Sequence, residues 1–165
     1  MMRHHDLAEV NIALAREPLD APLLADFIAA LDPVNARADS APGFVWRMQT
    51  EDGDAMAVRG FGGHPQLIIN LTVRESLEAL RSFVYRDRDH LGVMRRRREW
   101  FERLELHLVL WWVPIGYRPT VAEGENRLEH LRAHGPTRAA FTFRRYFGSP
   151  DTPTERIDDG WLCSA

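Results

Sequence analysis

The chain has 165 residues and a formal net charge of −3, and 45% of its residues are hydrophobic. This length fits one domain with a sizeable core, and the slightly acidic balance argues against general nucleic-acid binding. Cys163 is the single cysteine, which excludes a disulfide framework and a cysteine metal cluster, so we expect no metal site. No apolar run reaches the roughly 18 residues of a membrane span and no signal-peptide core is present, so we expect a cytoplasmic protein.

The N-terminal half alternates between strand and helix patterns. Residues 7–14 predict a strand with Val10 and Ile12 on one face, and residues 21–38 predict a helix with one apolar stripe. Residues 44–50 predict a second strand with Phe44, Trp46 and Met48 on a common face. After a turn, residues 55–59 predict a short return strand, and residues 67–73 a third strand whose polar face carries Asn70 and Thr72.

The C-terminal half contains helices and the most apolar strand of the chain. Helices are expected at 75–85, at 90–104 and, with a capping pattern from Thr120 to Glu123, up to His134. The strand at 106–113 is apolar on both faces, so it should be covered on both sides. Residues 140–147 predict a short extended piece.

The order of these elements predicts the fold. It matches the split β-α-β-β-α-β plan, with a four-stranded antiparallel sheet and an extra C-terminal helix. We therefore expect an α+β, ferredoxin-like domain over residues 1–148 and a flexible tail over 149–165. Helices on one side would leave an apolar sheet face bare, and a two-fold homodimer packed sheet on sheet would cover it.

Five segments of the sequence resemble a known bacterial family. They are VNIA at 10–13, WRMQTEDGD at 46–54, NLTV at 70–73, LVLWWVP at 108–114 and LRAHGPTRAAFTF at 131–143. The family is domain of unknown function 3291, and the resemblance covers nearly all of residues 7–147. It implies a dimeric α/β barrel with a ferredoxin-like protomer. Relatives in that superfamily include antibiotic-biosynthesis monooxygenases, haem-degrading monooxygenases and polyketide cyclases.

The resemblance also suggests a function class. It implies a small-molecule-binding protein or a monooxygenase-like enzyme that needs no cofactor, acting on an aromatic or polyketide-like substrate. Haem-degrading relatives carry an Asn, a Trp-Glu-Ser and a His, which Asn11, Glu75-Ser76 and His90 match in part. Arg74 stands where those relatives have the Trp that distorts the haem ring. We therefore expect no cofactor, with a haem-binding dimer as the less favoured alternative.

The candidate site residues lie on several elements that a pocket between sheet and helices would bring together. The catalytic candidates are Asn11 and His90, and the ligand-binding candidates are Trp46, Asn70, Tyr85, Arg97 and Trp100. Arg97 falls on the apolar arc of its helix, so it needs a ligand anion or a buried carboxylate such as Glu9 or Glu75. His90 fits a general base or an axial ligand, or a neutral core histidine.

Each of these residues also has a purely structural interpretation. The two asparagines can hydrogen-bond to backbone, and most of the aromatic residues can belong to the core or to a dimer interface. An enzyme, a non-catalytic ligand binder and a structural dimer therefore all remain consistent with the sequence.

Overall fold

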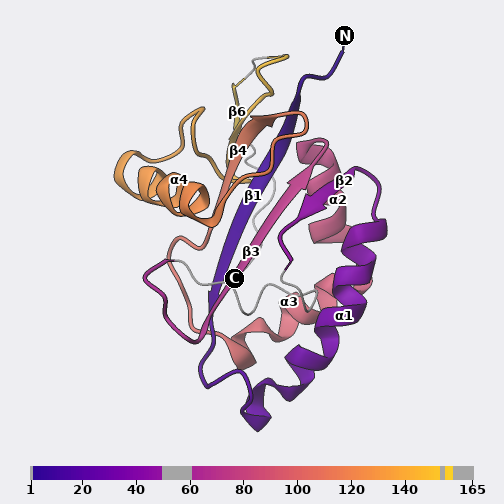
Figure 1. Cartoon of the computed structure of the whole chain (residues 1–165), viewed down its shortest axis with the longest axis vertical. Helices are drawn as coiled ribbons and strands as arrows, with labels where there is room; N and C mark the ends of the chain where they lie inside the picture. The colour runs from indigo at the N-terminus through magenta and orange to yellow at the C-terminus, as the bar shows by residue number, and fades with distance from the viewer. Residues whose placement is uncertain (1, 50–60, 153–154, 158–165) are drawn as a thin grey trace.

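A central antiparallel sheet organises the chain. The computed structural model describes residues 2–49, 61–152 and 155–157. Four strands, β1 (His5–Leu14), β2 (Phe44–Arg47), β3 (Leu67–Arg74) and β4 (Leu108–Pro114), pair in the order β2-β3-β1-β4 (Figure 1). This is the predicted α+β, ferredoxin-like arrangement. The predicted return strand at 55–59 lies outside the described residues.

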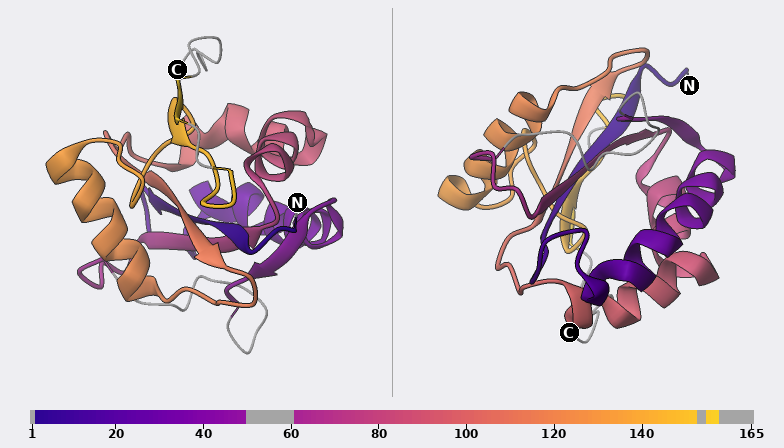
Figure 2. Two further views of the ribbon diagram at one scale, coloured as in Figure 1. Left: turned by 90° about the horizontal axis from the view of Figure 1, so that it is seen from above. Right: turned by 60° about the horizontal axis from the view of Figure 1, so that its bottom comes forward.

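Helices cover both faces of this sheet. One face packs against α1 (Ala25–Ser40), which follows a short 3₁₀ turn η1 (Pro22–Leu24), and against α2 (Leu77–Arg86) and α3 (Arg88–Trp100). The opposite face packs against α4 (Val121–His134), on the other side of the sheet in Figure 2. Of the helices in the described residues, none combines the length and apolar character that a membrane span needs.

The position of α4 corrects the expectation of a bare sheet face. Val10 and Trp111 on this face are buried together with Leu128 and Leu131 of α4. The contact is close because Gly124 lies over Val10, where an added Cβ would approach the Val10 side chain to 3.2 Å. The chain therefore covers much of this face with its own helix.

Two predicted elements differ from the structure for local reasons. β2 contains an irregularity between Phe44 and Trp46, which pair with the consecutive residues Arg74 and Val73. A bulge of this kind turns the two side chains to opposite faces, so the predicted common face is wrong for Phe44, whereas Trp46 and Met48 pack against the same cluster. The helix predicted at 90–104 ends at Trp100, because Phe101 is extended and bridges to Ala15 of the N-terminal segment.

The segment after residue 148 is partly tied to the sheet. β5 (Arg145–Phe147) lies just before the predicted tail, and it pairs with β6 (Glu155–Ile157), which lies inside that tail. The Asp151 carboxylate accepts hydrogen bonds from the backbone N–H groups of His4 and His5, at 2.9 and 3.1 Å. These bonds, together with that from the His5 ring, lower the pKa of Asp151. Residues 149–152 are thus attached at the start of β1.

Candidate functional site

A strip of polar side chains crosses the face of the sheet that α1, α2 and α3 cover. Glu9 of β1 stands opposite Thr72 of β3, and Asn11 stands opposite Asn70. Arg74, two residues beyond Thr72, continues the same face because side chains alternate along a strand. Polar groups this close to a core are costly to bury without partners, so each of them needs an explanation.

Glu9 is the titratable centre of this strip. Its side chain is buried, and its Oε2 accepts a hydrogen bond from the Thr72 hydroxyl at 3.4 Å. Burial raises the pKa of Glu9 to about 7, although the charge of Arg74 and the bond from Thr72 act in the opposite direction. Near neutral pH, Glu9 is therefore able both to accept and to donate a proton.

Arg74 is an almost completely buried cation, with 1% of its surface exposed. Its guanidinium lies against the rings of Phe83 and Phe44, with 4.5 and 5.3 Å between its central carbon and the ring centroids. Its Nε and Nη1 atoms find no hydrogen-bond acceptor in the part of the chain that the structure describes. Burial lowers the pKa of Arg74, whereas the charges of Glu9 and Asp39 favour the protonated form.

His90 lies beside this arginine on the first turn of α3. Its Nδ1 donates to the backbone carbonyl of Val84 at 3.0 Å, and its ring lies 5.0 Å from that of Phe83. Burial lowers the pKa of His90, and the nearby charge of Arg74 lowers it further. The neutral ring, with its proton on Nδ1, keeps Nε2 as an acceptor.

The helix that carries His90 begins directly after Asp87, between the helices predicted at 75–85 and 90–104. Asp87 caps α3, because its Oδ1 accepts hydrogen bonds from the backbone N–H groups of Asp89 and His90 at 3.1 and 3.0 Å. An Asp at this position satisfies N–H groups that have no partner inside the helix. The Asp87 cap therefore fixes the first turn of α3, which carries His90.

Three of the predicted site residues, Asn11, Asn70 and His90, lie on the same side of the sheet. Asn11 is half-buried and Asn70 is exposed, and their side chains form no hydrogen bonds within the described residues. Both asparagines and His90 lie on the side of the sheet that α1, α2 and α3 cover. Glu9 and Arg74 complete this group, which we call the polar strip site: Glu9, Asn11, Asn70, Thr72, Arg74 and His90.

The other predicted residues lie elsewhere, so the single pocket proposed from the sequence is not formed. Trp46 packs on the opposite face of the sheet, with the cluster that includes α4. Trp100 is buried between Phe27 and Phe101. Tyr85 lies edge-on to Phe143, with 5.8 Å between the ring centroids.

Arg97 is half-buried, whereas Arg95, Arg96 and Arg98 are exposed, as the helical arc predicted. It forms no ion pair with Glu9 or Glu75. Glu75 instead binds Arg3 at 3.1 Å. The pKa of His107 is lowered mainly by burial and, to a smaller extent, by the charge of Arg97. Among the arginines that the structure describes, Arg74 and not Arg97 is the fully buried one.

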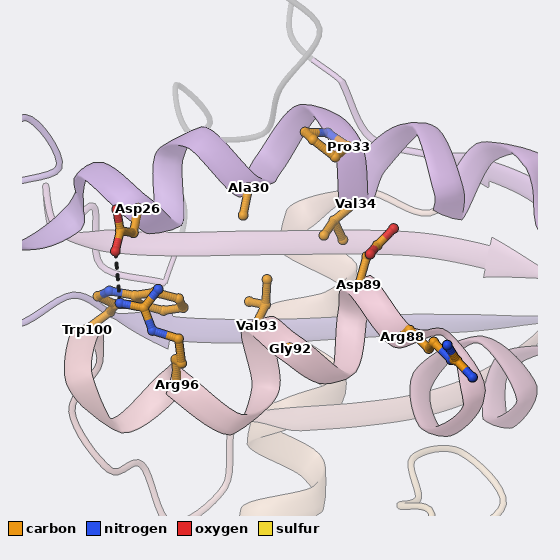
Figure 3. A pocket seen from close by; sticks show the side chains of 10 residues that line it. All are labelled: Asp26, Ala30, Pro33, Val34, Arg88, Asp89, Gly92, Val93, Arg96 and Trp100. Carbon is orange, nitrogen blue, oxygen red and sulfur yellow. Dashed lines mark hydrogen bonds and ion pairs between the residues drawn. The ribbon is translucent and has the colours of Figure 1, made fainter.

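A groove of about 380 Å³ runs between α1 and α3 (Figure 3). Its centre is apolar, with Ala30, Val34 and Val93 facing each other across the two helices. At one end Arg96 binds Asp26 at 2.9 Å and lies over the ring of Trp100. Among its described lining residues there is no buried polar atom without a partner, so the groove offers less evidence of a ligand than Arg74 does.

Sequence reasoning missed the two charged residues of the polar strip site. The signal was present, because Asn70, Thr72 and Arg74 alternate with the apolar residues of β3, and Glu9 alternates in the same way on β1. Arg74 was considered only as a departure from the haem-degrading pattern. Within the described residues, no group of three His, Cys, Asp or Glu side chains is placed to hold a metal ion.

Comparison with known proteins identifies the family. Residues 6–157 match the family described as Domain of unknown function (DUF3291), and the chain belongs to it. No curated protein matches the chain.

Several solved structures are similar in fold. SnoaB, a cofactor-independent oxygenase from Streptomyces nogalater, is 16% identical, with 70% of this chain and 96% of SnoaB covered and a TM-score of 0.43. The protein PA3566 from Pseudomonas aeruginosa is 12% identical, with 73% and 100% covered and a TM-score of 0.46. The protein Rv0793 from Mycobacterium tuberculosis is 12% identical, with 70% and 99% covered and a TM-score of 0.44. We draw no functional argument from these similarities.

Proposed function

We propose that this member of the DUF3291 family binds a small organic molecule at the polar strip site and exchanges a proton with it through Glu9. The observation that supports the proposal is a buried carboxyl group with a pKa of about 7, in line with side chains that have unused hydrogen-bonding capacity. A pKa near the working pH is what a general acid or base needs. Structural carboxylates more commonly sit in ion pairs, and Glu9 forms none with the residues that the structure describes.

The neighbouring side chains suit a ligand that bears hydroxyl or carbonyl groups. The amides of Asn11 and Asn70 each offer two N–H donors and one oxygen acceptor. Asn70 is exposed, so a ligand could reach the strip from that end of the sheet. In this arrangement the amides would orient the ligand, and Glu9 would remove a proton from an acidic O–H or C–H group.

A cofactor-independent monooxygenase acting on an aromatic or polyketide-like substrate is the finer form of this proposal. Removal of a proton from an activated CH₂ group leaves a carbanion, which can itself give electrons to O₂. The balanced reaction converts CH₂ and O₂ to C=O and H₂O, with one oxygen atom in each product. The alternative is a binder that stops at the proton exchange, without oxygen consumption.

Absorbance spectroscopy with naphthols and aromatic β-dicarbonyl compounds tests the proposal, because their anions absorb at longer wavelengths than the neutral forms. At neutral pH, the wild-type protein should bind a member of this panel and increase its anionic fraction. Glu9→Gln should retain binding and lose the spectral change, whereas Glu129→Gln, on an exposed face of α4, should behave like the wild type. An equal spectral change in Glu9→Gln would refute the role of Glu9. An oxygen electrode then separates the monooxygenase from the binder.

A homodimer is also proposed, although α4 covers much of the face first assigned to it. Support comes from large apolar side chains that stay only partly buried around the α4-covered cluster, including Trp46, Met48, Leu67 and Leu106. A second copy of the chain would bury them further. Light scattering should give about twice the 19.0 kDa chain mass, and a monomer at micromolar concentration would contradict the proposal.

A further inference from the structure

We infer that Arg74 binds the carboxylate of the ligand, so that the natural ligand is a small aromatic acid. This inference rests on the proposed function for the location of the site. It adds the chemical class of the ligand, which neither Glu9 nor the two asparagines can specify.

Two carboxylates of the chain that could have satisfied Arg74, those of Asp39 and Asp87, are already occupied. Asp39 is bound to Arg47, with 2.7 Å between its Oδ1 and the Arg47 Nε. Asp87 accepts from Arg37 at 3.1 Å and also caps α3. Each of these carboxylates already has its own cation.

Glu9 does not provide the missing acceptor for the Arg74 guanidinium either. It is near enough for its charge to act on Arg74, yet the two side chains form no ion pair. Its hydrogen-bond partner is the Thr72 hydroxyl. Within the described residues, the Arg74 guanidinium is therefore a buried cation whose Nε and Nη1 have no acceptor. A buried guanidinium needs an anion or several acceptors for stability, and the described residues place no acceptor at these two nitrogen atoms.

The groups around Arg74 also restrict the shape of the missing partner. A guanidinium offers planar pairs of N–H groups that match the two oxygens of a carboxylate. The rings of Phe44 and Phe83 lie against it, one from the neighbouring strand β2 and one from α2. Flat apolar surfaces beside a carboxylate-binding group favour an acid whose carboxylate is attached directly to an aromatic ring.

Calorimetric titration tests this class with two matched pairs of probes. The acids are benzoate and 2-naphthoate, and the neutral controls of the same shape are benzamide and 2-naphthamide. The wild type should bind at least one acid roughly tenfold or more tightly than its amide, since only the acid supplies a charge and two acceptor oxygens. Arg74→Met should abolish this preference, and Arg95→Met, an exposed position on α3, should leave it unchanged.

Thermal unfolding without ligand gives a second, independent measurement. Arg74→Met removes a buried charge that lacks a partner, so its melting temperature should equal or exceed that of the wild type. A large decrease in melting temperature, combined with equal binding of acid and amide by the wild type, would show that Arg74 has a structural partner and would overturn the inference. If Arg74→Met does not fold, Arg74→Lys replaces it in the titration. Lysine keeps the charge without the planar N–H pair, and unchanged acid preference in this variant would also overturn the inference.

Three further outcomes decide the inference, and the last two separate it from the proposed function. If chloride competes with benzoate at equal concentration, the site holds an adventitious ion only, and the inference is wrong. If naphthols lose their proton in a Glu9-dependent way while no acid is preferred over its amide, the proposed function stands and the inference fails. If acids bind through Arg74 but Glu9→Gln leaves proton exchange unchanged, the inference stands and the role of Glu9 is refuted.

Discussion

Replacement of Glu9 by glutamine should stabilise the protein, and the gain should depend on pH. Glutamine keeps the size of the side chain and an oxygen that can accept from Thr72, but it carries no charge. The pKa of Glu9 rises from an ordinary value of 4.5 to about 7 on folding, with burial as the largest cause. At about 1.4 kcal/mol for each pKa unit, the ionised carboxylate costs the folded state about 3 kcal/mol.

The sign of the effect follows from the protons bound in each state. Below the unfolded value of 4.5, Glu9 is protonated in both states and costs nothing. Between 4.5 and about 7 the folded state holds a proton that the unfolded state has lost, so stability falls as the pH rises. Above this range the loss is complete. Glu9→Gln should therefore gain about 3 kcal/mol near pH 8 and almost nothing near pH 4.

Urea unfolding followed by circular dichroism, at about pH 4 and about pH 8, measures the difference. Glu129→Gln is the matched control because the Glu129 side chain is 68% exposed, and it should change stability little at either pH. If Glu9→Gln destabilises the protein at pH 8, the ionised form of Glu9 has a stabilising partner in the fold. If the gain is the same at both pH values, it does not come from the charge. Either result would refute the reasoning.

Two tryptophan substitutions test the packing of the core, and a haemin titration tests the haem alternative. Trp111→Ala should cost about 3–5 kcal/mol in urea unfolding, because Trp111 is 1% exposed and its Nε1 donates to Glu123 at 3.0 Å. Trp112→Ala should cost less, since Trp112 is only half-buried. An equal cost would contradict the difference in burial between the two tryptophan side chains. Haemin should show no turnover with ascorbate, because Arg74 replaces the ring-distorting Trp of haem-degrading enzymes. Stoichiometric binding that His90→Ala abolishes, followed by loss of the Soret band, would favour the haem alternative.

The alternation of apolar and polar residues predicted the sheet well. On β1 and β3 it assigned the two faces correctly, including the face of Val10 and that of Asn70 and Thr72. The capping pattern at Thr120 also predicted the start of α4, where the Thr120 hydroxyl accepts from the Glu123 backbone N–H at 3.2 Å. Such features depend on residues close together in the sequence, so a single chain is enough to reveal them.

The features that the sequence did not reveal depend on distant contacts. The irregularity in β2 appears only when Phe44 and Trp46 pair with β3, because nothing in the segment itself marks a bulge. The end of α3 at Trp100 depends on the bridge from Phe101 to Ala15. The isolation of Arg74 is of the same kind, since it becomes visible only when every neighbouring carboxylate has been assigned to another partner.

The cover that α4 gives the sheet leads to a last prediction, made on two glycines. In Gly124→Ala the new Cβ would stand 3.2 Å from the Val10 side chain, which is fully buried and cannot move away freely. In Gly92→Ala, within α3, the new Cβ meets nothing within 4 Å. Alanine is favoured over glycine inside a helix by about 0.8–1.0 kcal/mol, so Gly92→Ala should be stabilising by about that amount. Gly124→Ala carries the same helical gain against an overpacking cost of about 1–3 kcal/mol, so it should be neutral to destabilising. The difference between the free energies of urea unfolding of the two variants removes the shared helical gain. It therefore reports how tightly α4 packs on β1. If Gly124→Ala were stabilised as much as Gly92→Ala, α4 would not lie on the sheet in solution, and that face would again be open to the sheet of a second chain.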